Sequence, residues 1–210
     1  MKRKSDYIWG KIMIYTGVLV LLISAGILAY NIWDENRAAD STARINQIMT
    51  EHIENNIKNR DSIEDPLYTD PEDNNDSDNT PLFIEINGER YIGILNIPVL
   101  SLELPVNYIL SDRRLKETPC RYAGDINTSL VIAGHNYRRH FSPLAKLRNG
   151  DSVTLTDAGG VNHSYTVDKI VTMNATDIEI MLDSSYELTL FTCNFSGMAR
   201  VAVRCVKNNS

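Results

Sequence analysis

The sequence predicts an all-β domain, a closed β-barrel of about seven or eight strands with short helices, preceded by an N-terminal transmembrane helix and a helical stalk. Two observations support this prediction. Residues 81–210 divide into short apolar runs separated by turn residues such as Asn149-Gly150, and regularly spaced short strands are typical of barrels. Residues 12–33 carry no charge, and a helix of about 20 residues crosses the hydrocarbon layer of a membrane.

The uncharged stretch predicts an uncleaved signal-anchor. Its 22 residues exceed the ~7–15 apolar residues of a cleaved signal peptide, and no clean A-x-A cleavage site follows. Basic residues precede the stretch and acidic residues follow it: Lys2, Arg3, Lys4 and Lys11, then Asp34 and Glu35. The positive-inside rule therefore predicts a single-pass protein with residues 1–11 in the cytoplasm and the rest of the chain outside the cell.

Residues 34–60 are expected to form a helical stalk that can lie against the domain. Isoleucine and methionine recur there at helical spacing, at Ile45, Ile48, Met49, Ile53 and Ile57, which makes one narrow apolar stripe. The stripe lasts barely two heptads, which argues against a coiled coil.

Residues 61–80 are predicted to be an acidic, flexible linker. The segment holds eight acidic residues, two prolines and no basic residue, so it lacks the apolar surface needed to offset its ordering entropy. A calcium-binding EF-hand loop is the alternative, but its glycine and its final glutamate are not in register.

Charge and motifs exclude several function classes. Residues 1–80 hold 14 acidic and 8 basic residues, whereas residues 81–210 hold 13 of each, so no basic footprint for nucleic acid exists. No phosphate-binding glycine motif follows a strand. The three cysteines, Cys120, Cys193 and Cys205, form no CxxC pair, which argues against a structural zinc site.

Within residues 81–210, the run "FIEINGERYIGILNI" predicts a hairpin that turns at Asn87-Gly88 and continues into a longer strand. The stretch "SPLAKLRNGD" predicts a short helical turn. The remaining runs, among them "SLVIAGH", "YELTLFTC" and "RVAVRCV", predict further strands.

Three chemically useful residues lie where predicted strands begin or end. Cys193 ends "LTLFTC", His135 ends "SLVIAGH" and Arg200 opens "RVAVRCV". Only a few per cent of a free thiol is ionised at neutral pH, so a nucleophilic cysteine needs a partner that favours the thiolate or later supplies a proton. The ends of these strands lie at the same rim of the barrel if the strands are neighbours. Arg200 can then return beside Cys193 and stabilise an oxyanion.

Taken singly, each of these residues has a plainer interpretation. A lone cysteine at a strand end is more often packing than chemistry, and Arg204 lies two residues further from the rim than Arg200. The other histidines, His52, His140 and His163, stand in polar or stalk contexts and are expected to be solvated.

Together these residues carry a resemblance to a known family. "TLFTC" with an upstream "AGH" and a following arginine resembles the signature of the sortases, the cysteine transpeptidases of Gram-positive cell surfaces. "YIGILNIPVLSLELPV" and "HFSPLAKLRNGDSVTL" resemble the family's opening strands and the stretch after its histidine. The resemblance covers about residues 89–206.

The resemblance implies that Cys193 is the nucleophile, His135 the acid–base and Arg200 the oxyanion- or substrate-orienting residue. It implies that the substrate site includes Thr192, Asn136, Asp177 and Ile178, the last two on a loop over residues 174–182. The implied substrates are a sorting-signal peptide that resembles Leu-Pro-x-Thr-Gly and an amine from a peptidoglycan precursor or a pilin. It implies no cofactor; calcium activates some relatives, but its ligands cannot be placed here.

Spacing within the site indicates a subclass. Cys193 and Arg200 are seven residues apart and His135 and Cys193 are 58 apart, which resembles a class D-like or unassigned clostridial sortase. Residues 65–67, Asp-Pro-Leu, resemble the lid of class C enzymes except that leucine replaces the aromatic residue.

Three questions stay open at the level of sequence. The chain is expected to be a transpeptidase, with a hydrolytic cysteine protease or amidase and a non-catalytic surface-binding module as the alternatives. Cys120 and Cys205 form either a disulfide or two buried thiols. The sequence does not give the oligomeric state.

Overall fold

The computed structural model describes residues 2–61, 82–174, 176–177, 182, 185–193 and 199–208. The chain divides into two compact units, 1–37 and 38–210. The predicted linker from residue 62 onward, together with the lid-like Asp-Pro-Leu, lies outside the described residues.

Two α-helices, two 3₁₀-helices and nine strands make up the described structure. In chain order they are α1 (Lys2–Asp61), β1 (Ile84–Ile86), β2 (Glu89–Ile97), η1 (Pro98–Leu100), β3 (Leu102–Asn107), α2 (Asp112–Leu115), β4 (Cys120–Ala123), β5 (Leu130–Ala133), η2 (Ser142–Lys146), β6 (Ser152–Asp157), β7 (Asn162–Asn174), β8 (Leu188–Cys193) and β9 (Ala199–Lys207).

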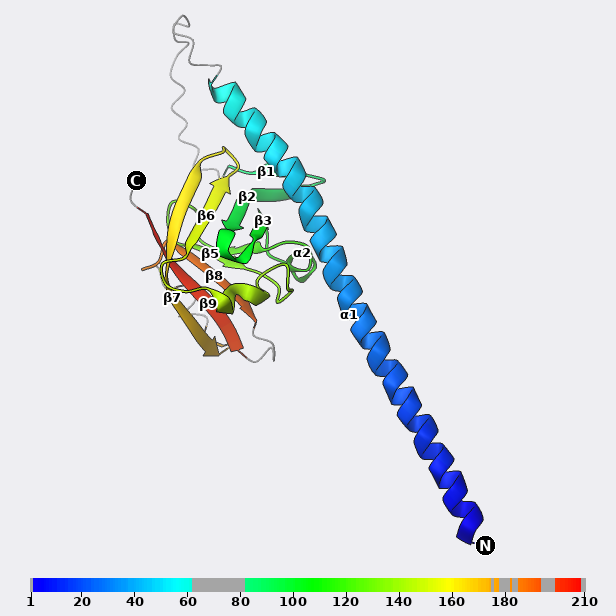
Figure 1. Cartoon of the computed structure of the whole chain (residues 1–210). Helices are drawn as coiled ribbons and strands as arrows, with labels where there is room; N and C mark the ends of the chain where they lie inside the picture. Colours follow the sequence, from blue (N-terminus) through cyan, green and yellow to red (C-terminus); the bar gives the residue numbers. More distant parts are fainter. Residues whose placement is uncertain are drawn as a thin grey trace, which may run out of the picture. The chain divides into compact units, whose positions relative to one another are not determined.

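The strands form one sheet that closes on itself. Their order is β1-β2-β3-β4-β5-β8-β9-β7-β6, and β2 also pairs with β6. This last pairing joins all strands except β1 into a ring, as can be followed in Figure 1. Closure leaves the strands of the ring without a free edge. The predicted closed β-barrel is confirmed.

The barrel encloses the main hydrophobic core. Seven strands, β2, β3 and β5 to β9, contribute mainly branched aliphatic residues to it from one side, and Phe141 and Leu144 at η2 belong to the same cluster. The buried members from the strands are Ile92, Leu95, Ile97, Leu102, Leu104, Val106, Leu130, Ile132, Val153, Leu155, Tyr165, Val167, Leu188, Leu190, Val203 and Cys205.

Two glycine-containing sites shape the β1–β2 region. Asn87 and Gly88 have φ angles of 53° and 76°, which a two-residue hairpin turn of this hand requires, so the predicted hairpin is confirmed. Gly93 lies where β2 meets β6, and a Cβ atom there would approach the Thr156 carbonyl oxygen to 2.2 Å. Closure of the barrel therefore depends on the missing side chain at Gly93.

In the N-terminal unit, α1 is long and apolar enough to cross a membrane. Its most apolar stretch carries few charged residues and is not buried within the protein. Large apolar side chains from Trp9 to Trp33 are exposed. Length and composition are therefore consistent with the predicted membrane span.

Within the second unit, the last part of α1 packs against the outside of the barrel. Met49 and Ile53 are buried against β1, β2 and Ala158, and Ile45 and Ile57 pack beside them. Ile48 of the same predicted stripe is 37% exposed. The apolar stripe of the stalk therefore covers the barrel wall rather than a second helix.

We expect Gly93→Val to lower the free energy of unfolding by about 2–3 kcal/mol, because the new side chain clashes with backbone at the β2–β6 junction. Urea denaturation of the full-length chain in detergent, followed by near-UV circular dichroism, measures this change. Asn96→Val is the matched control, since Asn96 pairs with the same strand but is exposed; it should change stability by less than about 0.5 kcal/mol. Equal stabilities of the two variants would contradict the account of closure.

Candidate active site

Three neighbouring strands bring the predicted catalytic residues to one rim of the barrel. β5 runs parallel to β8, with Ala133 opposite Phe191, and the Gly134 amide donates to the Phe191 carbonyl at 3.0 Å. His135 therefore follows β5 at the level where β8 ends in Cys193. Parallel strands have their carboxyl ends on the same side of a sheet, so the two residues share a rim.

The third predicted residue joins them through the antiparallel β8–β9 pair. Cys193 and Arg200 are direct backbone partners in its register, so Arg200 begins β9 at the level where β8 ends. Arg200 is partly buried. The order β5-β8-β9 thus supplies the neighbouring strands on which the sequence-based hypothesis depended.

The two candidate arginines have different surroundings. Arg204 is 2% exposed and donates from Nη1 to the Thr189 hydroxyl at 2.8 Å. Its guanidinium carbon lies 5.6 Å from the Tyr186 ring centroid. Arg204 is therefore held within the strand pair, whereas Arg200 lies beside the end of β8; the preference for Arg200 stays a prediction.

An apolar surface extends from this rim over the outside of the barrel. Val131 and Ala133 of β5, Phe191 of β8 and Ala202 of β9 are buried in one cluster with Met173. Tyr122 meets Phe191 edge-to-face, with ring centroids 5.2 Å apart. Leu115, Ala123 and Val171 pack against the same cluster. This surface lies on the opposite side of the strands from the barrel core.

The predicted substrate-binding residues have different positions. Thr192 is buried, and its Oγ1 has no hydrogen-bond partner among the described residues. Asn136 is half-buried in the loop after His135. Asp177 accepts the Asn174 amide at 3.0 Å and closes a turn after β7. Ile178 lies outside the described residues. None of these observations assigns a ligand.

His135 is flanked by an aromatic residue that sequence reasoning missed. The Tyr137 ring stacks on the His135 ring with centroids 4.0 Å apart and an interplanar angle of 17°. Tyr137 also meets His140 in a tilted contact at 5.5 Å. The spacing His-x-Tyr was visible in the sequence, but a loop has no periodicity from which to predict this stack.

The expectation that all other histidines are solvated is correct for His52 and wrong for two others. His140 is 1% exposed; burial, with a smaller effect of the nearby His135 charge, lowers its pKa to about 4. His163 is mostly buried and its Nε2 lies 2.8 Å from the Asp157 carboxylate. Both corrections arise from tertiary contacts that polar sequence neighbours conceal.

Cys120 and Cys205 are buried, free thiols. This resolves the two alternatives in favour of reduced cysteines in the present structure. Burial raises the pKa of each thiol to about 12. Because the thiolate is the reactive form, neither residue is suited to nucleophilic chemistry.

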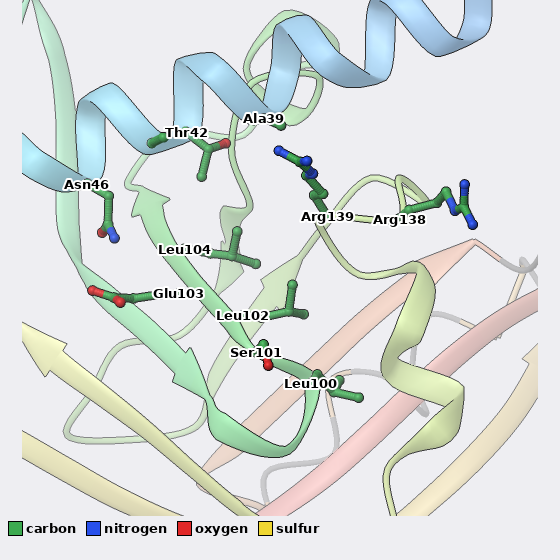
Figure 2. A pocket seen from close by; sticks show the side chains of 11 residues that line it. Ala39, Thr42, Asn46, Leu100, Ser101, Leu102, Glu103, Leu104, Arg138 and Arg139 are labelled. Carbon is green, nitrogen blue, oxygen red and sulfur yellow. The ribbon is translucent and has the colours of Figure 1, made fainter.

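Two hollows lie near the rim. One, of about 430 Å³, is bordered by α1, the β2–β3 connection with the start of β3, and the loop after His135. Figure 2 shows Thr42 and Asn46 of α1 on one side of it and Arg139 extending toward the helix. The other, of about 360 Å³, is lined by the end of β7, Asp177 and Ala199. It adjoins Arg200 through the Met173–Arg200 strand pair.

Within the described part of the chain, no three His, Cys, Asp or Glu side chains are grouped to hold a metal ion. The sequence-based expectation of no metal and no cofactor stays a prediction.

Comparison with known proteins relates this arrangement to one family. A family model described as a sortase domain matches residues 95–208. Sortase A of Bacillus anthracis is 29% identical over 119 residues, which cover 51% of this chain and 54% of that relative. The chain thus matches only about half the length of this curated relative.

Two solved structures share the fold. Sortase C of Clostridium perfringens, solved with its C-terminal cell wall sorting motif, has a TM-score of 0.51 and 23% identity, covering 57% of this chain and 71% of that one. A sortase D5 transpeptidase of Clostridium perfringens has a TM-score of 0.52 and 17% identity, covering 57% and 79%. These similar proteins are named as sortases A, C and D5. The class D-like assignment therefore stays a prediction.

The burial of His140 predicts a pH-dependent loss of stability. Its folded pKa of about 4 lies below the ordinary value near 6.5, so the unfolded chain takes up a proton that the folded chain resists. The free energy of unfolding should therefore fall between pH 6.5 and 4, by up to about 3 kcal/mol. Denaturation of wild type and His140→Gln across this range isolates the effect, because the variant lacks it. Parallel pH profiles would contradict it.

The cysteines should differ in reactivity. At pH 8 a thiol with a pKa of about 12 is roughly 10⁻⁴ ionised. We therefore expect iodoacetamide to label Cys193 alone in the folded chain, and Cys120 and Cys205 only after denaturation. Peptide mapping by mass spectrometry reads out each site. Labelling of all three at similar rates in the folded chain would refute this assignment.

Proposed function

The chain belongs to the sortase family, and from that premise we propose that it is a membrane-anchored cysteine transpeptidase. It cleaves an LPxTG-like sorting signal through a thioester on Cys193 and transfers the acyl group to an amine of the cell wall or of a pilin. One observation carries the proposal. The β5-β8-β9 order brings a histidine, a cysteine and an arginine together at one rim.

The first half of the reaction is acyl transfer to the enzyme. The Cys193 thiolate attacks the carbonyl carbon of the residue before the scissile bond, which is threonine in the expected signal. The C–N bond breaks as His135 protonates the departing amine, so the leaving group is neutral. The product is a thioester, and the two-step route replaces one difficult acyl transfer with two easier ones.

The second half transfers the acyl group to an acceptor. His135 removes a proton from the incoming amine, the amine nitrogen attacks the thioester carbonyl, and the Cys193 thiolate leaves. The acceptor is an amine of a peptidoglycan precursor or a pilin lysine. The histidine returns to its protonated state, and the enzyme needs no cofactor to balance the cycle.

Arg200 supports the charge that develops in both tetrahedral intermediates. Its register position opposite Cys193 supports this role, because a cation beside the nucleophile stabilises a developing oxyanion. Preorganised donors of this kind typically contribute 10²–10³-fold in rate. Substrate contacts are assigned to Thr192, Asn136, Asp177 and Ile178.

The sorting peptide lies along the outer apolar surface. Phe191 and Ala202 lie on the strands that carry Cys193 and Arg200, so this cluster underlies the path that an apolar leucine and proline of the signal follow when the scissile bond reaches the rim. The sorting motif in the Clostridium perfringens sortase C structure supports a peptide partner of this kind.

The domain acts at the outer surface of a Gram-positive-type cell membrane. α1 supplies an apolar segment of sufficient length, and the basic residues before it with the acidic residues after it favour a cytoplasmic N-terminus. The enzyme therefore meets its substrates as they emerge from the membrane.

We expect Cys193→Ala in the full-length enzyme to lower turnover of a sorting-signal peptide by at least about 10³-fold, because the thioester can no longer form. Cys120→Ala and Cys205→Ala serve as matched controls and should retain most of the turnover. Mass spectrometry identifies the products and captures the Cys193 thioester. Near-wild-type cleavage by Cys193→Ala would sink the assignment.

Adding a nucleophilic amine to the same assay distinguishes the alternatives. An amide product identifies a transpeptidase, whereas the carboxylic acid alone, with or without amine, identifies a hydrolytic protease or amidase. Binding without cleavage, and without a thioester, identifies a non-catalytic surface module.

A further inference from the structure

A hydrogen-bonded pair connects α1 to the loop that follows His135. The Thr42 hydroxyl of α1 donates to the Glu117 carbonyl at 2.7 Å, and its oxygen also lies 3.1 Å from Nε2 of His140. Both side chains are buried. These contacts join parts of the chain 98 residues apart in sequence, within a single compact unit.

Proton accounting fixes the state of the His140 ring. A hydroxyl has one hydrogen, and the Thr42 hydrogen is engaged by Glu117. Nε2 of His140 must therefore carry a hydrogen and donate it to a lone pair of the Thr42 oxygen. Burial keeps the ring neutral at pH 7, since it lowers the pKa to about 4. The ring is thus held in one tautomer and one orientation.

Tyr137 contacts both His140 and His135. Its ring meets the His140 ring at 5.5 Å and 60° and stacks on the His135 ring at 4.0 Å and 17°. His135 lies two residues beyond the end of β5, so the strand ladder does not itself hold the imidazole. Its carbonyl accepts the Phe141 amide at 3.2 Å, which holds the backbone here, and Tyr137 covers one face of the ring.

The tight turn around this loop limits other arrangements. A Cβ atom on Gly134 would lie 2.3 Å from the Phe141 ring, so the chain can follow this course only with glycine there. The loop that begins at His135 is therefore packed against its own return. Tyr137 and His140 lie on that packed loop, and Thr42 contacts it from α1.

We propose that Thr42, His140 and Tyr137 are positioning residues that orient the His135 imidazole, so that α1 is part of the support of the active site. The inference rests on the proposed acid–base role of His135. Proton transfer requires the ring nitrogen within about 2.6–3.2 Å of the reacting group, and misplacement by about 1 Å can cost 10²-fold. A small rotation of the ring is thus sufficient to slow the chemical steps without weakening peptide binding.

The test compares variants of the full-length enzyme in detergent with a sorting-signal peptide. Thr42→Val keeps the shape of the side chain and removes the hydroxyl. His140→Leu removes the ring donor, whereas His140→Gln places an amide N–H near the position of Nε2 and should rescue. His163→Gln is the matched control, because His163 lies at the other end of β7 from the rim. His163 pairs with Asp157 near the start of β7, whereas Met173, which pairs with Arg200, lies near its end.

We expect kcat to fall about ten-fold in Thr42→Val and His140→Leu with KM within two-fold of wild type, and His140→Gln to stay within two-fold in both. The Cε1–H proton resonance of His135 lies in the ring current of Tyr137, so it should move in Thr42→Val and His140→Leu and stay in His140→Gln and His163→Gln. This resonance reports ring position independently of activity.

Wild-type kcat in Thr42→Val and His140→Leu would overturn the inference, as would a change confined to KM or a Gln variant as slow as the Leu variant. If His140→Leu fails to fold, the isosteric Thr42→Val decides alone. These outcomes differ from failure of the proposed function, which would appear as turnover that survives Cys193→Ala. An unmoved His135 resonance in Thr42→Val overturns the positioning chain even for a catalytically inactive protein.

Discussion

The parallel pairing of β5 with β8 is the constraint on which the candidate site depends. Nearly all other pairs in the barrel are antiparallel, and an antiparallel pair would place the ends of these two strands on opposite rims. Because β5 and β8 run the same way, the residues that follow and end them meet. β9 then returns antiparallel, so its beginning adds Arg200 at the same level. The long connection between β5 and β8 contributes η2, β6 and β7, and these elements complete the barrel.

Strand alternation on this frame separates residues of similar chemistry. Val203 and Cys205 of β9 belong to the barrel core, whereas Ala202 belongs to the outer apolar surface. Cys205 is thereby a buried thiol whose pKa is raised to about 12, although it lies only 12 residues from Cys193. Arg204, also buried, is bonded to Thr189 across the strand pair, as the cost of burying a charge requires. The same alternation that makes the core turns Cys205 away from the site, whereas the two arginines share one face and differ in that Arg200 lies at the rim.

Local patterns were sufficient for the barrel and its hairpin, because strand alternation and the Asn87-Gly88 turn are encoded in adjacent residues. Grouping His135, Cys193 and Arg200 required a further assumption, that their strands are neighbours, which only the sheet order supplies. His140 and His163 were misassigned as solvated because their burial comes from Thr42 and from a hairpin partner rather than from their sequence neighbours. Likewise, no short-range pattern shows that β2 pairs with both β3 and β6.

The stalk region of α1 both covers the barrel wall and contacts the loop that carries His140. Its apolar stripe covers Ile84, Ile86, Tyr91 and Ile94 on the barrel wall, a surface that would otherwise expose a contiguous apolar patch. Three residues before the stripe begins at Ile45, Thr42 meets the loop that carries His140. A helix held in place by burial of Met49 and Ile53 can present a hydroxyl with the accuracy that one hydrogen bond demands, whereas a freely moving stalk cannot. The packing of this helix segment is therefore the physical basis on which a residue distant in sequence can influence the geometry of His135.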